Sequence, residues 1–330
     1  MTYFTVVIPV YNRSDEVDEL LESLTQQTYK NFEVIIVEDG SQIPCRKVVN
    51  NYIEKLTIQY LTKENTGPGL SRNYGANYAK GNYIVFFDSD CIIPEKYFEI
   101  VKNTLESEKI DAYGGPDMAH SSFTNIQKAI SYSMTSTLTT GGIRGGKERM
   151  DKFHPRSFNM GFSKDVFAVT KGFSEMRFGE DVDMSLRIIQ ADFTTKLISQ
   201  AAVYHKRRTN FKQFFKQVYN SGIARINLYK RHPKSLKLVH FLPAVFFEGS
   251  IFLVLLSLLS FWFLAPLLVI ALAFFVDSLA KTKNLSIAFL SVIASFIQLW
   301  AYGSGFMVAF FKRIVLNKGE FKAFATNFYR

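Results

Sequence analysis

The sequence predicts an α/β fold, with a mostly parallel, doubly wound sheet followed by helices that span a membrane. Short β-branched or aromatic runs at residues 4–8, 32–37, 58–61 and 83–87 alternate with segments that favour helix, an order typical of parallel sheets with right-handed crossovers. Residues 241–311 are almost continuously apolar, which is enough for about three membrane spans. We therefore expect a globular catalytic domain followed by a membrane anchor.

The first two predicted strands are each followed by a loop that contains polar residues. The run at 4–8 stops at Pro9, which cannot donate a hydrogen bond to a sheet ladder, and Tyr11 follows in the next loop. The run at 32–37 leads directly into Glu38 and Asp39. Both loops are expected at the carboxyl ends of their strands.

The run at 83–87 ends in two carboxylates, Asp88 and Asp90. The carboxyl ends of parallel strands meet at one edge of the sheet, where ligands bind, so we expect these acids to lie near Tyr11 and Asp39. Hard oxygen ligands suit Mg²⁺ or Mn²⁺, and such ions usually arrive with substrate phosphates. The alternative is a polar turn with two solvated acids.

Composition excludes several other classes of protein. The 330 residues carry a net charge of +10 and two cysteines, Cys45 and Cys91, which offer no disulfide framework and fit a reducing compartment. Neither G-x-G-x-x-G nor G-x-x-x-x-G-K-[ST] occurs, so a Rossmann dinucleotide site and a P-loop are both excluded. Met1 leads straight into a strand-like run, and we expect no signal peptide.

Seven short stretches, in this order and spacing, resemble the family 2 glycosyltransferases, whose catalytic domain has the GT-A fold. They are residues 7–12, 37–41, 67–73, 88–90, 158–162, 172–173 and 179–187. The resemblance covers roughly residues 4–232, and it implies sugar transfer from a nucleotide-sugar donor. One departure is Glu38, which stands where the family often has a second Asp.

The resemblance implies a donor site. Glu38 would contact the donor, and Asp39 beside it would accept a hydrogen bond from the nucleobase, most often uracil. A carboxylate that faces an imide N–H forms a charge-assisted pair. Pro9 and Tyr11 would form the wall of the base pocket, and Arg72 would approach the diphosphate. The alternatives are a turn acid that caps the next helix for Asp39, ordinary loop packing for Pro9 and a solvated helix charge for Arg72.

The resemblance also implies a divalent metal, Mn²⁺ or Mg²⁺. Asp90 would hold the metal that bridges the diphosphate, and Asp88 would lean toward the ribose and share the metal. His205 would complete the metal shell, since imidazole suits Mn²⁺. The alternative for His205 is a surface position beside Lys206.

On the acceptor side, Asp181 is the predicted general base. It opens a helix expected at 182–189, where the positive end of the helix keeps a carboxylate ionised. Glu180, Asn159 and Gly161 are expected to contact the acceptor. With one base and no second carboxylate nucleophile, we expect direct displacement with inversion. Simple helix-end electrostatics is the alternative for Glu180 and Asp181, and the Gly-rich loop at 139–146 is either a lid or an idle surface loop.

The sequence predicts four regions, with boundaries at 1–210, 211–240, 241–311 and 312–330. The first is the catalytic domain, the second a basic amphipathic helix on an anionic membrane surface, and the last a basic tail. Nucleic-acid binding by the basic helix is the weaker alternative, because an apolar segment adjoins it. The third region divides into spans at 241–260, 261–280 and 285–311.

The membrane topology stays open from sequence. Basic residues before the first span predict a cytosolic catalytic domain. Three spans would then put Lys312, Arg313 and Lys318 outside, against the same rule. Either the number of spans is smaller, or the third segment is re-entrant.

These patterns together predict an inverting, metal-dependent glycosyltransferase of the inner or plasma membrane. We expect a UDP-sugar donor and a saccharide or lipid-linked acceptor in envelope or exopolysaccharide synthesis. A polyprenyl-phosphate glycosyltransferase is the alternative enzyme, and a membrane scaffold without activity is the alternative from another class. A processive synthase is disfavoured, because no Q-x-x-R-W motif follows residue 181.

Overall fold

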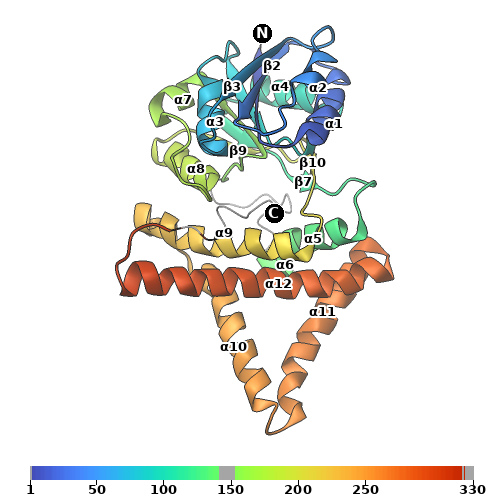
Figure 1. The fold of residues 1–330 in the computed structure, drawn as a ribbon, viewed down its shortest axis with the longest axis vertical. Helices are drawn as coiled ribbons and strands as arrows, with labels where there is room; N and C mark the ends of the chain where they lie inside the picture. The colour runs from blue at the N-terminus through green and yellow to red at the C-terminus, as the bar shows by residue number, and fades with distance from the viewer. Residues whose placement is uncertain (1, 141–152, 322, 324–330) are drawn as a thin grey trace. The chain divides into compact units, whose positions relative to one another are not determined.

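The computed structural model describes residues 2–140, 153–321 and 323. The chain divides into two compact units, Met1–His120 with Gly146–Lys206 and Ser121–Gly145 with Arg207–Arg330. The first unit is an α/β domain, and the second is helical in its described residues (Figure 1). The sequence put a boundary at residue 210, whereas this division falls after Lys206 and also groups residues 121–140 with the C-terminal helices.

The first unit is built on a mixed sheet of seven strands. Strand β8 is antiparallel to both of its neighbours, and the remaining pairs are parallel, which confirms the mostly parallel sheet. The strand order is β3 (Ile58–Lys63), β2 (Phe32–Asp39), β1 (Phe4–Val10), β4 (Tyr83–Phe87), β8 (Asn159–Ser163), β6 (Ala112–Gly114) and β9 (Thr195–Leu197).

Helices cover both faces of this sheet. Successive side chains of a strand point to opposite faces of the sheet. Val6 of β1 therefore packs on one face, in a cluster with residues of α1 and α4, and Val7 packs on the other, in a cluster with residues of α3 and α8. The helices of the unit are α1 (Ser14–Thr25), α2 (Arg46–Asn50), α3 (Pro68–Ala76), α4 (Tyr97–Ser107), α7 (Lys164–Thr170) and α8 (Glu180–Gln190). Burial on both faces is why the strands are apolar throughout.

Strand β1 does not stop at Pro9, as the sequence predicted, but continues to Val10. Its pairing with β4 ends at Val7, whereas its pairing with β2 continues through Pro9 to Val10. The missing N–H of Pro9 is tolerated because β1 no longer pairs with β4 at that position, so no hydrogen bond is needed on that side.

A small second sheet was not predicted. It consists of β5 (Cys91–Ile92), β10 (Val203–His205) and β7 (Asp117–Met118), in that order. Strand β10 pairs His205 with Cys91 across an antiparallel ladder and runs parallel to β7. This sheet brings His205 to the end of the Asp88–Asp90 loop.

The second unit contains the apolar segments. Its helices are α5 (Asn125–Thr135), α6 (Thr137–Thr140), α9 (Phe211–Arg231), α10 (Leu242–Leu256), α11 (Ala265–Thr282) and α12 (Leu285–Phe310), with short helical turns at Pro233–Ser235, Leu238–Phe241, Phe261–Leu264 and Phe311–Val315. Three helical segments are apolar and long enough to cross a membrane: Leu238–Leu256, Phe261–Thr282 and Leu285–Val315. They match the three predicted spans within a few residues.

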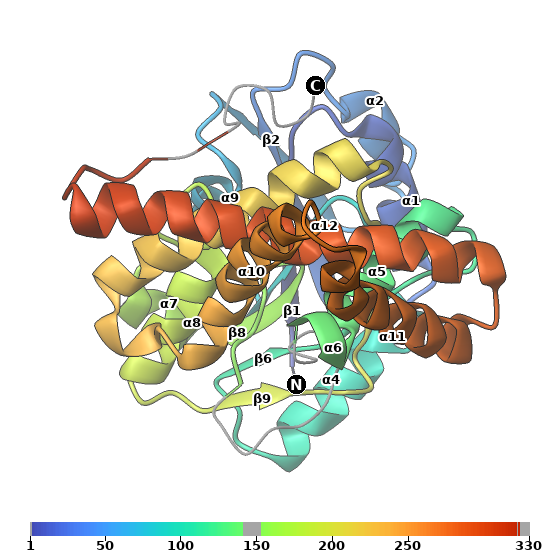
Figure 2. The same cartoon turned by 90° about the horizontal axis from the view of Figure 1, so that it is seen from below.

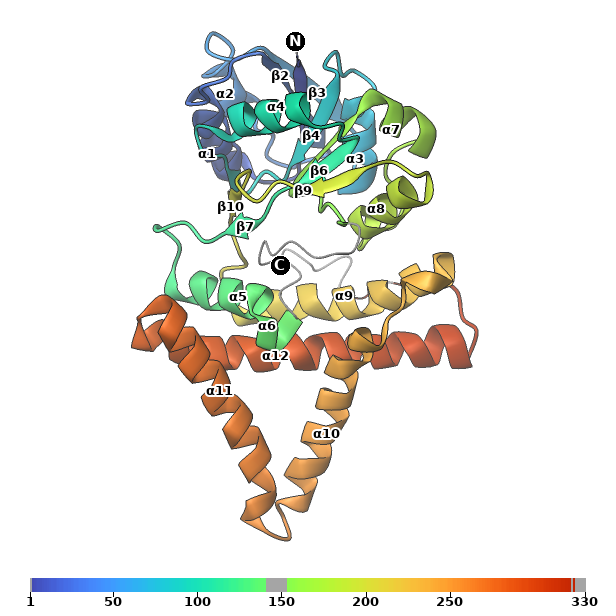
Figure 3. The same cartoon turned by 180° about the vertical axis from the view of Figure 1, so that it is seen from behind.

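Within this unit, α10 and α11 form a hairpin that leads away from α12, on the side opposite α9 (Figures 1 and 3). Seen from below, the hairpin overlies α12 (Figure 2).

Candidate active site

Arg72 links the two acidic motifs of the first unit. Its Nη2 donates to Asp88 Oδ1 at 2.6 Å and its Nη1 donates to Glu180 Oε1 at 3.1 Å. The side chain is buried, and its guanidinium lies 5.3 Å from the centre of the Phe173 ring. Arg72 is therefore not a solvated helix charge.

Two opposing effects act on the charge of Arg72. Burial by itself lowers the pKa of its guanidinium, but the carboxylates of Asp88 and Glu180 outweigh burial and raise that pKa. Arg72 thus stays a cation in a dry environment, which is the form that a diphosphate would meet.

Glu180 and Asp181 occupy the first turn of α8, after Gly179 in the left-handed conformation at φ 85°. Burial, reinforced by the neighbouring charge of Asp181, raises the pKa of Glu180 to about 7, although Arg72 acts in the opposite direction. The sequence predicted the helix at 182–189, and the structure extends it by two residues toward the N-terminus.

Asp181 has a partner that sequence analysis missed. Arg156 Nε donates to Asp181 Oδ2 at 2.6 Å, and the Val182 N–H donates to Asp181 Oδ1 at 2.8 Å. The Asp181 side chain is 12% exposed and that of Arg156 27%. No sequence signal identified Arg156, because it lies between strands and outside the recognised stretches.

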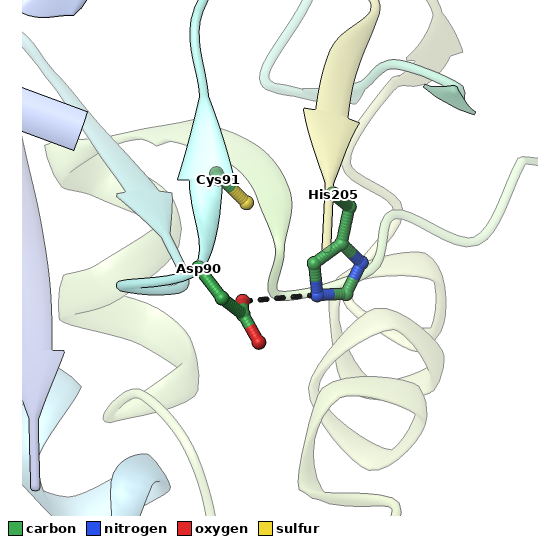
Figure 4. A group of neighbouring side chains, drawn as sticks. All are labelled: Asp90, Cys91 and His205. Atoms are coloured by element: carbon green, nitrogen blue, oxygen red, sulfur yellow. Dashed lines mark ion pairs between the residues drawn. The ribbon is translucent and has the colours of Figure 1, made fainter. Parts of the chain in front are cut away.

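Asp90, in the turn just before β5, faces His205 of β10 (Figure 4). His205 Nε2 lies 3.1 Å from Asp90 Oδ1 and 3.9 Å from Asp88 Oδ2. The Phe158 ring stacks on the His205 ring with centroids 5.0 Å apart, which limits how the imidazole can turn. Two carboxylates converging on one imidazole nitrogen fit a divalent cation such as Mn²⁺.

Cys91 is close to this group, since ligand atoms of Asp90, Cys91 and His205 all lie within 4.8 Å of one another. Burial, together with the charges of Asp90 and Asp88, raises the pKa of the Cys91 thiol well above its usual value. The thiol contacts the Phe158 carbonyl at 3.5 Å. A protonated thiol is a poor metal ligand, so the oxygens and the imidazole are the better candidates.

Asp117 lies on the other side of the His205 ring, and sequence analysis missed it. Asp117 Oδ2 is 3.8 Å from His205 Nδ1, and the Asp117 side chain is fully buried. A carboxylate at this position favours the tautomer with the proton on Nδ1 and leaves Nε2 free for a metal. The signal that could have found it is an acid just after the short run 112–114 and a Gly-Pro turn.

If Asp117 orients His205, Asp117→Asn is expected to weaken Mn²⁺ affinity by about 10–100-fold, the usual effect of losing such a partner. Calorimetry with Mn²⁺ measures the affinity. Nitrogen-15 NMR of the His205 ring measures the tautomer, with His205→Gln assigning its signals among the five histidines.

Asp165→Asn is the matched control, because Asp165 is an exposed acid in α7 of the same unit. It should change neither quantity. An Asp117→Asn protein with an unchanged tautomer and unchanged Mn²⁺ affinity would show that Asp117 does not orient His205.

Asp39 is tied into the loop before α3. Its carboxylate accepts from Lys63 Nζ at 2.6 Å and from the backbone N–H groups of Thr66 and Gly67, both at 2.9 Å. The contacted N–H groups precede α3 and not α2, the next helix along the chain, so the predicted alternative of a cap on the next helix does not describe these contacts. A carboxylate has about four acceptor positions, so these contacts leave capacity for a ligand.

Glu38 organises the loop that follows β2. Its Oε2 accepts from the Cys45 N–H and the Tyr60 hydroxyl, both at 2.8 Å, and its Oε1 accepts from the Ser41 hydroxyl. All three contacts are internal to the first unit, so Glu38 shapes the loop around Asp39. The predicted donor contact of Glu38 stays a prediction.

The three predicted loops do meet at one edge of the sheet. The Gln42 N–H donates to the side-chain oxygen of Asn12 at 2.8 Å, and this hydrogen bond joins the loop after β2 to the loop after β1. Asn12 has a positive φ of 53°. Strand β4 pairs in parallel with β1, so the loop after β4, which carries Asp88 and Asp90, lies at the same edge of the sheet. Pro9 and Tyr11 lie at this edge, and their contact with a base stays a prediction.

Asn159 and Gly161 have structural tasks in β8. The Asn159 side chain donates to the Ala201 carbonyl at 2.7 Å and accepts from the Tyr97 hydroxyl at 2.6 Å, and it is fully buried. A Cβ at Gly161 would lie 2.3 Å from the Tyr113 ring. Their predicted contact with an acceptor stays a prediction, and residues 141–146 of the Gly-rich loop lie outside the described residues.

A family profile described as glycosyl transferase family 2 matches residues 5–170. An uncharacterised glycosyltransferase of Haemophilus influenzae is 32% identical over 218 residues, which cover 62% of this chain and 70% of that protein. This chain belongs to glycosyl transferase family 2. The family membership makes it a glycosyltransferase, as the resemblance implied.

Other family 2 relatives are matched over smaller parts. The minor teichoic acid biosynthesis protein GgaB of Bacillus subtilis is 36% identical over 110 residues, which cover 32% of this chain and 12% of GgaB. The chain therefore spans only a small part of that relative's length.

A solved structure has a similar fold. The mannosyltransferase PcManGT from Pyrobaculum calidifontis, solved in complex with GDP-Man and Mn²⁺, superimposes with a TM-score of 0.63 at 15% identity, covering 91% of this chain and 87% of that one. At this identity the likeness concerns the fold, and it agrees with the GT-A architecture predicted from the sequence.

Proposed function

We propose that this glycosyltransferase moves a sugar from a nucleotide-diphosphate donor, with a UDP-sugar as the first candidate, to an acceptor hydroxyl with inversion. The observation that carries the proposal is the Arg72 bridge. One buried cation joins Asp88, in the acidic loop, to Glu180, which adjoins Asp181. Such a bridge couples a site for phosphates to a site for the proton of the acceptor.

On the donor side, each residue has a task that suits its surroundings. Asp39 would accept from the nucleobase, beside Pro9 and Tyr11, and Arg72 would move part of its hydrogen bonding from Asp88 to the diphosphate. Asp90, Asp88 and His205 would hold the divalent cation, Mn²⁺ or Mg²⁺. When bound, that cation neutralises negative charge on the leaving diphosphate.

On the acceptor side, Asp181 would take the proton of the attacking hydroxyl. Its ion pair with Arg156 holds the carboxylate in one orientation. Glu180 would contact the acceptor next to it. Because one base serves one face of the sugar, displacement gives the opposite anomeric configuration.

A phosphate acceptor is a second candidate, and Arg156 favours it. A guanidinium beside Asp181 could bind a polyprenyl phosphate, whose oxygen needs no base to remove a proton. This acceptor would make Asp181 a residue that positions Arg156.

The setting we propose is the inner or plasma membrane, with the catalytic unit in the cytosol. The apolar helices of the second unit and the basic residues of α9 support it. A lipid-linked saccharide in envelope or exopolysaccharide synthesis is the acceptor class we propose, since the relative GgaB is a protein of minor teichoic acid biosynthesis. A scaffold without activity is disfavoured, since the acidic residues of the family stretches are retained.

A donor panel tests the proposed function. The purified full chain is incubated with UDP-sugars and GDP-sugars, with Mn²⁺ or with EDTA, and release of the nucleoside diphosphate is measured. We expect release from one sugar class, dependent on the metal. Adding a lipid-linked saccharide or a polyprenyl phosphate should raise the rate for the true acceptor class. A folded protein that neither binds nor cleaves any nucleotide sugar would contradict the proposal.

A further inference from the structure

We propose that α10 and α11 enter the membrane as a hairpin whose tip ends inside the hydrocarbon, and that α12 lies along the membrane surface instead of crossing it. Three helical segments are apolar enough to span. The packing within the second unit distinguishes the third of them from the other two. The partner of this surface is a lipid bilayer.

Helix α12 packs closely against α9. A Cβ at Gly222 of α9 would lie 2.3 Å from the Tyr302 carbonyl of α12, and a Cβ at Gly305 of α12 would lie 2.2 Å from the Tyr219 carbonyl of α9. The two backbones therefore touch. Ile223 and Ile226 of α9 extend the contact to Phe306 and its neighbours.

Helix α9 cannot cross a bilayer. Five basic residues are distributed along its 21 residues: Lys212, Lys216, Arg225, Lys230 and Arg231. Charges at membrane depth are costly, whereas basic amphipathic helices bind at the surface of anionic membranes. Because α12 lies against α9 in backbone contact, a spanning α12 would carry these charges into the hydrocarbon.

The segment after α12 returns to α9, which also opposes a crossing. Arg231 Nη2, at the end of α9, lies 3.0 Å from Glu320 Oε2. The Ala323 N–H donates to Asn220 Oδ1 of α9 at 3.2 Å. The C-terminal end of α12 therefore stays on the side of α9, which puts the basic residues near 312–318 on the side that the positive-inside rule requires.

The exposed side of α12 is one apolar stripe. Its large exposed side chains are Leu285, Phe289, Ile293, Trp300 and Met307, continued by Phe311 just beyond its end, at intervals of four, four, seven, seven and four residues. Such intervals keep one face of a helix. The α9-facing Gly305 lies on the opposite side, so α12 presents apolar residues to lipid along its whole length.

The hairpin leaves α12 from the side of this stripe. The Phe296 ring of α12 lies 5.7 Å from that of Phe246 in α10 and 6.0 Å from that of Phe274 in α11. At the base of α11, Ser278 Oγ donates to Ser291 Oγ of α12 at 2.8 Å. The base of the hairpin is thus held by α12, while its tip leads away (Figure 3).

The hairpin itself suits the hydrocarbon. No charged residue occurs between Glu248 and Asp277. At the tip, Leu258, Phe261 and Trp262 are 84%, 85% and 83% exposed. The α-helices of the two limbs, with 15 and 18 residues, are about 22 and 27 Å long at 1.5 Å per residue, and the turn between them, residues 257–264, carries no charged residue that would hold it at the far headgroups. The apolar tip therefore ends inside the bilayer.

The two tryptophans of the chain, Trp262 at the tip and Trp300 in the middle of α12, report directly on this arrangement. The full chain is reconstituted in phosphatidylcholine and phosphatidylglycerol vesicles, with bromine atoms either near the headgroups or near the chain ends. Trp262→Phe leaves Trp300 alone, and Trp300→Phe leaves Trp262 alone. Fluorescence quenching then measures the depth of each.

We expect Trp300 to be quenched several-fold more by the shallow bromines, and Trp262 more by the deep ones. A spanning α12 would put its middle at the centre of the bilayer, so deep quenching of Trp300 would overturn the proposal. Shallow quenching of Trp262 would overturn it too. The wild-type protein contains both tryptophans, so its quenching should equal the sum of the quenching measured for the two variants. A difference from that sum would reveal a variant that misfolds.

Discussion

Asp181→Asn is expected to lower sugar transfer by roughly 10²–10⁴-fold, the usual loss when a positioned base is removed. Asparagine keeps the size and polarity of Asp181 and can still accept from Arg156, but it cannot take a proton. The affinity for the nucleotide should stay near that of the wild type, because the proposed role of Asp181 concerns the acceptor. Initial rates at saturating donor and acceptor measure the first quantity, and calorimetry measures the second.

Glu180→Gln is the matched control for Asp181→Asn, because the two acids are adjacent in α8. The pKa of Glu180 is raised to about 7, so Glu180 is the rival base. If it were the base, Glu180→Gln would cause the larger loss and would remove the dependence of the rate on pH near 7. If Asp181 is the base, that variant affects the rate less and leaves Asp181 as the group that determines turnover.

The stereochemistry of the product tests the same mechanism independently. Direct displacement predicts an anomeric configuration opposite to that of the donor, which NMR of the purified glycoside shows. A retained configuration would contradict a single displacement. Near-normal turnover of Asp181→Asn with a hydroxyl acceptor would contradict the base, whereas near-normal turnover with a polyprenyl phosphate would favour the second candidate function.

Asp90→Ala is expected to abolish the metal-dependent part of nucleotide binding. Because Asp90 would bind the metal directly, Asp90→Ala should lower the Mn²⁺ affinity by more than the 10–100-fold that is typical when a residue hydrogen-bonded to a metal ligand is lost. The fold should survive, since Asp90 follows the core strand β4 and does not belong to the apolar core. Calorimetry with UDP, with and without Mn²⁺, measures the change.

Cys91→Ser is the matched control for Asp90→Ala. Cys91 adjoins Asp90 in the chain and lies near His205, but its thiol is protonated and points to the Phe158 carbonyl. The control variant should therefore keep the Mn²⁺ dependence of UDP binding. An Asp90→Ala protein that keeps it as well would remove Asp90 from the metal site.

Local patterns were enough to predict much of this protein. The apolar strand Tyr83–Phe87 and the acids after it predicted the edge of the sheet at which the three loops meet. The apolar segments that begin near residue 241 predicted α10, α11 and α12, whereas α5 and α6 were not predicted. These features depend on a few neighbouring residues, so the hydrophobic pattern and the residue order carry them.

Only the tertiary structure decided which distant residues meet. Arg156 reaches Asp181 and Asp117 lies behind His205 because β6, β8 and the small sheet bring together segments far apart in sequence. The contact of α12 with α9 is of the same kind, since hydropathy reports that a helix is apolar but not which neighbour it touches. Side-chain pairing across the fold depends on the whole backbone, and a linear pattern does not contain it.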